Sequence, residues 1–168
     1  MNYPNTIFKY PAVYAYTLFA CMFLHAGFFH LFFNMYFLWV FGDNVEDRVG
    51  SAKFVVFYLS CGIFAGLMHT FFTSHPEYPT LGASGAVSGI MGAYLVLYPQ
   101  AKLRINMLII FRPVQFRLPV WFYLGVWFLG SQLVYAFLDM PGTAWYAHIA
   151  GFIFGFGLML GMRKLNYL

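Results

Sequence analysis

Five long apolar segments constrain this sequence more than any other feature. They occupy residues 27–42, 54–72, 82–98, 118–138 and 144–162. Because a helix needs about 20 apolar residues to cross a bilayer core about 30 Å thick, we expect about five transmembrane helices. Hydrophobic residues make up 62% of the chain and charged residues only 8%, which is too apolar for a water-soluble domain. The sequence therefore predicts an all-α, polytopic helical membrane bundle.

The positions of the basic residues predict the orientation of this bundle. Arg48 and Lys53 lie in one connection, Arg163 and Lys164 lie in the tail, and four more basic residues lie between positions 99 and 117. With five spans, these three regions lie on the same side of the membrane. The positive-inside rule places that side, and the C-terminus, in the cytoplasm. Since orientation accounts for these charges and they form no dense cluster, we expect no nucleic-acid partner.

A single domain is expected over residues 1–168, with residues 1–26 forming part of an outer loop. An outer N-terminal segment has to be exported, yet residues 1–16 contain no signal peptide and are too polar to span a bilayer. We therefore expect that a preceding transmembrane helix is missing from this chain. Periodicity leaves open whether residues 10–25 lie on the membrane surface or cross it. Residues 99–117 alternate apolar and basic side chains, which predicts a hairpin at the interface.

Four polar side chains fall within or at the ends of the apolar segments: His30, Asn34, Ser84 and His148. Polar groups inside a membrane usually face a bundle interior or a wet cavity. His30 and Asn34 are four residues apart and share a helix face, while Ser84 and His148 each lie near the outer start of a span. Each has an ordinary structural explanation, as a packing residue, an interfacial histidine or an interhelical hydrogen-bond pair. Their common depth near the outer face favours one shared site.

This combination of side chains is suited to acyl transfer. A serine hydroxyl becomes a strong nucleophile when a neighbouring base takes its proton, and His148 is the expected base for Ser84. Glycines in the third and fifth spans, many of them four residues apart, allow two helices to approach closely enough for that contact. No carboxylate lies at the same depth on the outer side. We therefore predict a Ser84–His148 dyad that uses no cofactor and no metal ion.

The motifs resemble those of the rhomboid intramembrane serine proteases. The matching stretches are His25-x4-His30-x3-Asn34, Gly42-Asp43-Asn44-Val45-Glu46-Asp47-Arg48, Gly82-Ala83-Ser84-Gly85 and Ala147-His148-x2-Gly151-x3-Gly155. The resemblance implies that Ser84 is the nucleophile and His148 the general base. It implies an oxyanion site made of His30, Asn34 and the backbone at Gly82, Ala83 and Ser84. The implied substrates are transmembrane segments of other proteins, and the first of the family's six or more spans is absent here.

Two other functions are compatible with such a bundle. A non-catalytic rhomboid-like protein would bind transmembrane clients, and the loss of Ser84 or His148 would favour that function, but both residues are present. A small transporter or channel would carry polar residues through to the inner side, whereas here they stop in the outer half. We expect an integral protein of a bacterial inner membrane with its active site toward the outer face. The natural substrate and the oligomeric state stay open.

Overall fold

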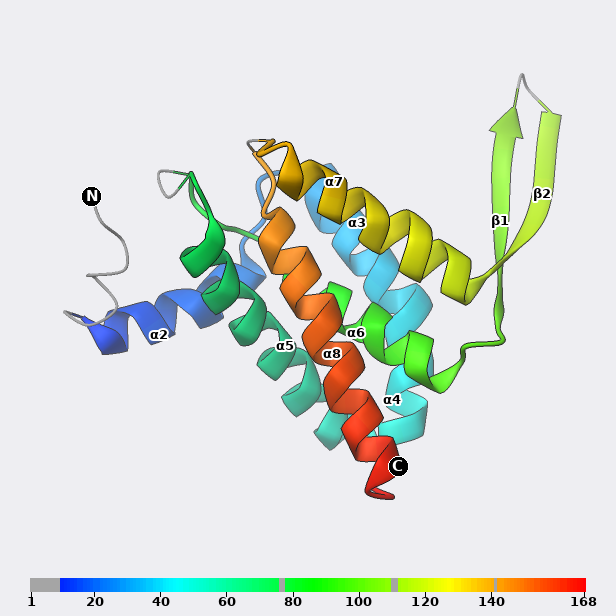
Figure 1. The fold of residues 1–168 in the computed structure, drawn as a ribbon, viewed down its shortest axis with the longest axis horizontal. Coiled ribbons are helices and arrows are strands. Elements are labelled where there is room, and N and C mark those ends of the chain that lie inside the picture. The colour runs from blue at the N-terminus through cyan, green and yellow to red at the C-terminus, as the bar shows by residue number, and fades with distance from the viewer. Residues whose placement is uncertain (1–9, 76–77, 110–111, 141) are drawn as a thin grey trace.

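The computed structural model describes residues 10–75, 78–109, 112–140 and 142–168, and these are mostly helical. The helical segments are α2 (Pro11–Ala20), η1 (Cys21–Phe23), α3 (Phe28–Phe37), η2 (Leu38–Gly42), α4 (Asp43–Val49), α5 (Ser51–Phe72), α6 (Ser84–Leu97), η3 (Trp121–Phe128), α7 (Leu129–Phe137) and α8 (Trp145–Lys164). The strands are β1 (Lys102–Ile109) and β2 (Arg112–Pro119). Figure 1 shows the helices as one bundle, from which α2 and the two strands project. The predicted helical membrane class is confirmed, with one hairpin added.

Helices α5, α6 and α8 form the centre of the bundle (Figure 1). The short helix α6 is buried along nearly its whole length, and α8 and α5 pack against it. The core between these helices contains Ile90, Met91, Cys61 and Phe152, all almost fully buried. Burial of α6 on all sides explains why its sequence is apolar and glycine-rich without a polar face.

Glycines bring α6 and α8 into direct backbone contact. A Cβ atom placed on Gly151 would overlap the carbonyl oxygen of Gly85, and one on Gly155 would overlap the carbonyl oxygen of Gly89. Neither overlap can be relieved by a side-chain rotation, because the obstructing atoms belong to the backbone. The close approach predicted from the glycine spacing is confirmed. We call the contact between α6 and α8 the glycine seam.

Two helices of the described residues, α5 and α8, are long and apolar enough to cross a membrane. The segments Pro11–Phe23 and Phe28–Val49 qualify together but are bent by 86° at the break between them. Ser84–Leu97 and Trp121–Phe137 are shorter apolar helices. The expected count of about five spans therefore stays a prediction. The bend separates Pro11–Phe23 from α3, the helix that carries His30.

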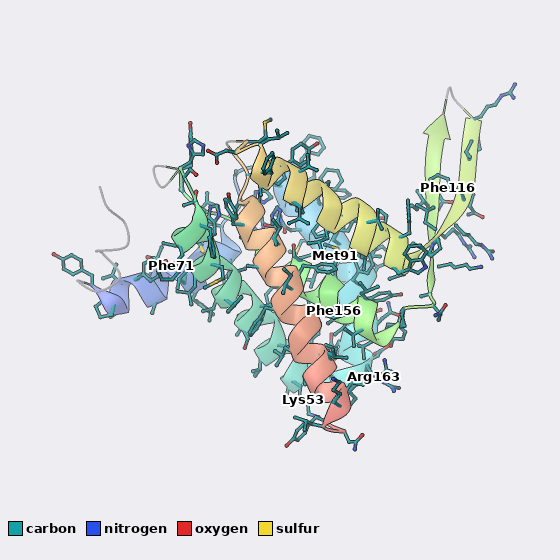
Figure 2. All side chains as sticks on the ribbon, in the orientation of Figure 1. Lys53, Phe71, Met91, Phe116, Phe156 and Arg163 are labelled. Atoms are coloured by element: carbon teal, nitrogen blue, oxygen red, sulfur yellow. The ribbon has the colours of Figure 1, made fainter. Side chains whose placement is uncertain are left out.

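The link between α6 and η3 forms an antiparallel hairpin of β1 and β2. Its register pairs Arg104 with Arg117 and Ile105 with Phe116. Successive strand residues point to opposite faces, so Lys102, Arg104 and Arg117 share one face while Leu103, Ile105 and Phe116 share the other. Figure 2 shows Phe116 on the hairpin, away from the helical bundle. The predicted hairpin is confirmed, and its place at the membrane interface stays a prediction.

Two basic side chains bind backbone carbonyl oxygens at the end of the bundle that holds the C-terminus. The Lys53 ammonium group donates a hydrogen bond to the carbonyl oxygen of Tyr167 (2.8 Å), and the Arg163 guanidinium donates to that of Val96 (3.1 Å). Figure 2 shows Lys53 and Arg163 at that end. Ser84 and His148 both fall in the first turn of their helices. They therefore lie at the N-terminal ends of α6 and α8, away from this basic end.

Candidate active site

Ser84 is the first residue of α6, as the sequence predicted. The chain reaches it through Gly82, whose φ of 112° is rarely accessible to residues with a side chain. This turn starts the helix abruptly and leaves the Ser84 hydroxyl at its N-terminal end. The N–H groups of a first helical turn have no acceptor within the helix. Ser84 therefore combines an accessible hydroxyl with nearby backbone donors.

His148 reaches Ser84 across the glycine seam. Its Nε2 atom lies 2.8 Å from the Ser84 hydroxyl oxygen, which is a direct hydrogen-bond distance. The two residues are 64 positions apart in the chain, so only the packing of α6 on α8 brings them together. The Trp145 ring lies edge-on to the imidazole with 6.1 Å between ring centroids. The structure thus pairs a hydroxyl with an imidazole that can accept its proton.

A third side chain completes the surroundings of the imidazole, and our sequence reasoning missed it. The Gln132 amide oxygen lies 2.7 Å from His148 Nδ1. Gln132 comes from α7 and is only 8% exposed. A usable signal existed, because a glutamine within the apolar segment 118–138 is as unfavourable in a bilayer as Ser84 or His148. The third partner of the pair is thus an uncharged amide, whereas the sequence led us to expect no third member because no carboxylate lies at this depth.

His30 and Asn34 lie on α3, beside the turn that leads to Ser84. Asn34 is 5% exposed, and its amide donates one hydrogen to the His30 carbonyl oxygen at 2.8 Å, which leaves its second hydrogen available. His30 Nδ1 accepts a long hydrogen bond from the Ala26 N–H (3.4 Å), which favours the neutral tautomer with its hydrogen on Nε2. A Cβ on Gly82 would lie 2.8 Å from that Nε2 atom. Both side chains therefore hold a donor near Ser84.

The backbone donors differ in part from those expected. The Gly82 N–H already donates to the carbonyl oxygen of Cys21 at 2.9 Å, so it is not free to bind a second acceptor. Gly82 instead forms the turn that precedes α6, and its lack of a side chain leaves room for the His30 ring. The Ala83 N–H points to His25 Nε2 at 3.5 Å, a long and weak contact that a better acceptor could replace. Ala83 and Ser84 thus stay candidate donors, and Gly82 does not.

A cavity of about 600 Å³ joins these groups. The predicted residues His30, Asn34, Ser84 and His148 all line it, together with Gln132. Other parts of its wall are apolar and come from Phe33, Met91 and Phe128. The cavity is large enough for several residues of a peptide and for water.

Two further observations bear on the chemistry of the cavity. His69 on α5 also lines it, and its Nδ1 atom is buried without a hydrogen-bond partner among the described residues. Among the residues that the structure describes, no three His, Cys, Asp or Glu side chains are placed to hold a metal ion. The groups around Ser84 are therefore hydroxyl, imidazole and amide groups, which suit proton transfer and the binding of a developing anion.

Comparison with known proteins identifies a family. A sequence model of the Rhomboid domain matches residues 13–165. YdcA of Bacillus subtilis is 40% identical over 74 residues, which cover 44% of this chain and 37% of YdcA. Rhomboid protease GluP of the same organism is 43% identical over 72 residues, or 43% of this chain and 14% of GluP.

Similarity extends to mitochondrial proteins. Rhomboid protein 1, mitochondrial, of Saccharomyces cerevisiae is 34% identical over 85 residues, which cover 48% of this chain and 25% of the yeast protein. The aligned parts cover 37% of YdcA, 14% of GluP and 25% of the yeast protein. The shared region is thus a fraction of each relative.

Proposed function

The chain belongs to the rhomboid family of integral membrane proteins, and from this premise we propose that it is an intramembrane serine protease. In this proposal Ser84 is the nucleophile and His148 is the general base. The substrates are peptide bonds in or near the transmembrane segments of other membrane proteins. The protein lies in a bacterial inner membrane with its basic end in the cytoplasm and its cavity toward the outer face.

One observation carries the proposal: the 2.8 Å contact between Ser84 Oγ and His148 Nε2 at the wall of a cavity. A serine that only packs against a helix bonds its own backbone, as Ser88 does with the carbonyl oxygen of Ser84. The Ser84 hydroxyl instead meets a base from another helix. An activated serine needs that arrangement.

The donors beside Ser84 give the proposal its second support. Attack on a peptide carbonyl turns its oxygen into an anion, which requires hydrogen-bond donors already in place. The Nε2–H of His30 and the second amide hydrogen of Asn34 lie next to the turn before Ser84. The backbone N–H groups of Ala83 and Ser84 complete the set. Removing one such donor typically lowers kcat by about 10²–10³-fold.

The proposed reaction has two halves. Ser84 Oγ attacks the scissile carbonyl carbon while its proton passes to His148 Nε2, and a tetrahedral oxyanion forms. The protonated imidazole then gives this proton to the leaving amine, the peptide C–N bond breaks, and an acyl-serine remains. Water enters the cavity, loses a proton to His148 and attacks the ester. The carboxylic acid product leaves and the Ser84 hydroxyl is restored.

Cleavage of a reporter transmembrane substrate in liposomes tests this proposal. Ser84→Ala and His148→Ala should each lower cleavage by at least about ten-thousand-fold. The matched control is Ser60→Ala on α5, because the Ser60 hydroxyl donates to the carbonyl oxygen of Val56 in its own helix. That control should cleave at the wild-type rate.

Other outcomes would count against the proposal. Cleavage that persists in Ser84→Ala would show that another group is the nucleophile. If the folded wild-type protein neither cleaves the reporter nor reacts with a fluorophosphonate probe, a client-binding rhomboid-like protein becomes the better reading. Mass spectrometry of the labelled peptide identifies the reacting serine.

A further inference from the structure

The short contact between Gln132 and His148 has a direction that its chemistry fixes. The Gln132 amide oxygen can only accept a hydrogen bond, and it lies 2.7 Å from His148 Nδ1. The hydrogen of that bond must therefore come from Nδ1. A neutral imidazole carries only one N–H, so Nε2 then presents its lone pair.

That lone pair is directed at Ser84. Nε2 lies 2.8 Å from the Ser84 hydroxyl oxygen, and with no hydrogen of its own it can only accept one. The opposite tautomer would place a hydrogen on Nε2 and leave no acceptor for the serine proton. The same tautomer would also present an Nδ1 lone pair to the amide oxygen, which is repulsive. The amide of Gln132 thus disfavours the unproductive form of the ring.

We propose that Gln132 is a positioning residue that holds His148 in the tautomer and orientation needed to deprotonate Ser84. The inference rests on the proposed protease function. Gln132 does not touch the reacting atoms, and its neutral amide takes no proton during the reaction. When the ring becomes an imidazolium, the same oxygen still accepts from Nδ1–H, so the contact persists through both halves of the reaction.

The surroundings of Gln132 favour this role over simple packing. Its amide nitrogen has only a long contact, 3.4 Å, to the Ser131 hydroxyl, whose own hydrogen goes to the carbonyl oxygen of Phe128. The one short bond of the Gln132 side chain in the described structure is therefore the bond to His148. Gln132 and Ala136 are the residues that α7 buries, while Leu133 and Val134 are 52% and 56% exposed. The helix thus turns the Gln132 amide inward to the imidazole and Leu133 and Val134 outward.

Three variants separate positioning from structure. Gln132→Met keeps the length and volume of the side chain but removes the amide oxygen. Gln132→Glu keeps an acceptor at the same place. Leu133→Met makes the matched replacement on the exposed face of α7. Reporter cleavage gives kcat and KM for each, and the rate at which a fluorophosphonate labels Ser84 measures nucleophile activation without any peptide substrate.

We expect Gln132→Met to lower kcat and the labelling rate by about 10–100-fold with KM changed less than about twofold. Gln132→Glu should recover most of the loss, and Leu133→Met should match the wild type. If thermal unfolding shows that Gln132→Met does not fold, Gln132→Ala takes its place with the same expectation.

Wild-type kcat and labelling in Gln132→Met would overturn the inference, and so would a loss in Gln132→Glu as large as that in Gln132→Met. Both results leave the protease proposal intact as long as Ser84→Ala is inactive. Absence of Ser84 labelling in the folded wild-type protein would instead overturn the protease proposal, and this inference with it.

Discussion

The glycine seam and helix α7 both position His148, but by different kinds of contact. Across the seam, the backbones of α6 and α8 touch at Gly85, Gly89, Gly151 and Gly155, so no side chain can adjust the distance. Helix α7 instead reaches α8 through side chains and buries only Gln132 and Ala136. Its Phe137 is 89% exposed. The proposed nucleophile and base are therefore held by rigid backbone contact, whereas the group that orients the base is on a loosely packed helix.

This difference corresponds to two separate requirements of the proposed reaction, the distance for proton transfer and the orientation of the imidazole ring. A proton transfer needs its two heavy atoms within hydrogen-bond distance, and direct backbone packing fixes such a distance most firmly. Orienting a ring needs a single well-placed acceptor. A helix with few buried contacts can supply that acceptor and can also move away without unfolding the core. Four predictions, from the largest expected effect to the smallest, test whether the two regions differ in this way.

The seam should tolerate no added carbon. Gly155→Ala places a Cβ against the carbonyl oxygen of Gly89, and we expect it to lower the free energy of unfolding by about 3 kcal/mol. Gly157→Ala is the matched control two residues on, where a Cβ meets nothing within 4 Å. Thermal unfolding in detergent compares the two. Equal stabilities would show that α6 and α8 are not in backbone contact.

The turn before Ser84 should be the next most sensitive position. Gly82→Ala combines a φ of 112° with a Cβ placed 2.7 Å from the His30 ring. We expect a loss of about 1–3 kcal/mol in stability from the strained backbone. Displacement of His30 should also lower kcat, and reporter cleavage measures it. Wild-type kcat in a folded Gly82→Ala protein would argue against a role for His30 beside the oxyanion.

Hydrogen exchange should distinguish the two regions without any mutation. Because α7 has few buried contacts and α6 is enclosed, backbone amides of Leu129–Phe137 should exchange at least about tenfold faster than those of Ser84–Leu97. Mass spectrometry of the protein in nanodiscs resolves peptides from both helices. Equal protection of α7 and α6 would remove the contrast between them.

The smallest effect is expected within α7 itself. A Cβ on Gly130 meets nothing within 4 Å, so Gly130→Ala should be accepted there. Alanine favours helix over glycine by up to about 1 kcal/mol, and the free energy of unfolding should rise by no more than that. Cleavage of the reporter should be unchanged. A destabilised Gly130→Ala protein would mean that α7 is packed more tightly than its exposure indicates.

Local patterns in the sequence predicted much of the site. The four-residue spacing of His30 and Asn34 put both on one face of α3, and the motif Gly82-Ala83-Ser84-Gly85 was placed at the start of a span, where α6 begins. These features depend on neighbouring residues, so a single sequence reveals them. The hairpin was predicted for the same reason, because alternation along a strand is also a local pattern.

One contact between distant segments, that of Ser84 with His148, was expected from the sequence, but others were not. The backbone at Gly82 was expected to belong to the oxyanion site, but its N–H donates to the carbonyl oxygen of Cys21, in the segment before α3. The bond from His148 to Gln132 joins residues on two helices separated by a turn. Polarity marked Gln132 as unusual, but it could not tell which neighbour the amide would meet.

By itself, then, the sequence determined a helical membrane protein of the rhomboid family and the residues that could carry acyl transfer. Apolar length, glycine spacing and motif order suffice for that, because they are properties of short stretches of chain. Beyond the expected Ser84–His148 pair, only the tertiary structure decided which polar groups are partners and which are already occupied. A hydrogen bond across helices depends on the register and separation of two packed backbones, and in this protein the glycine seam sets both.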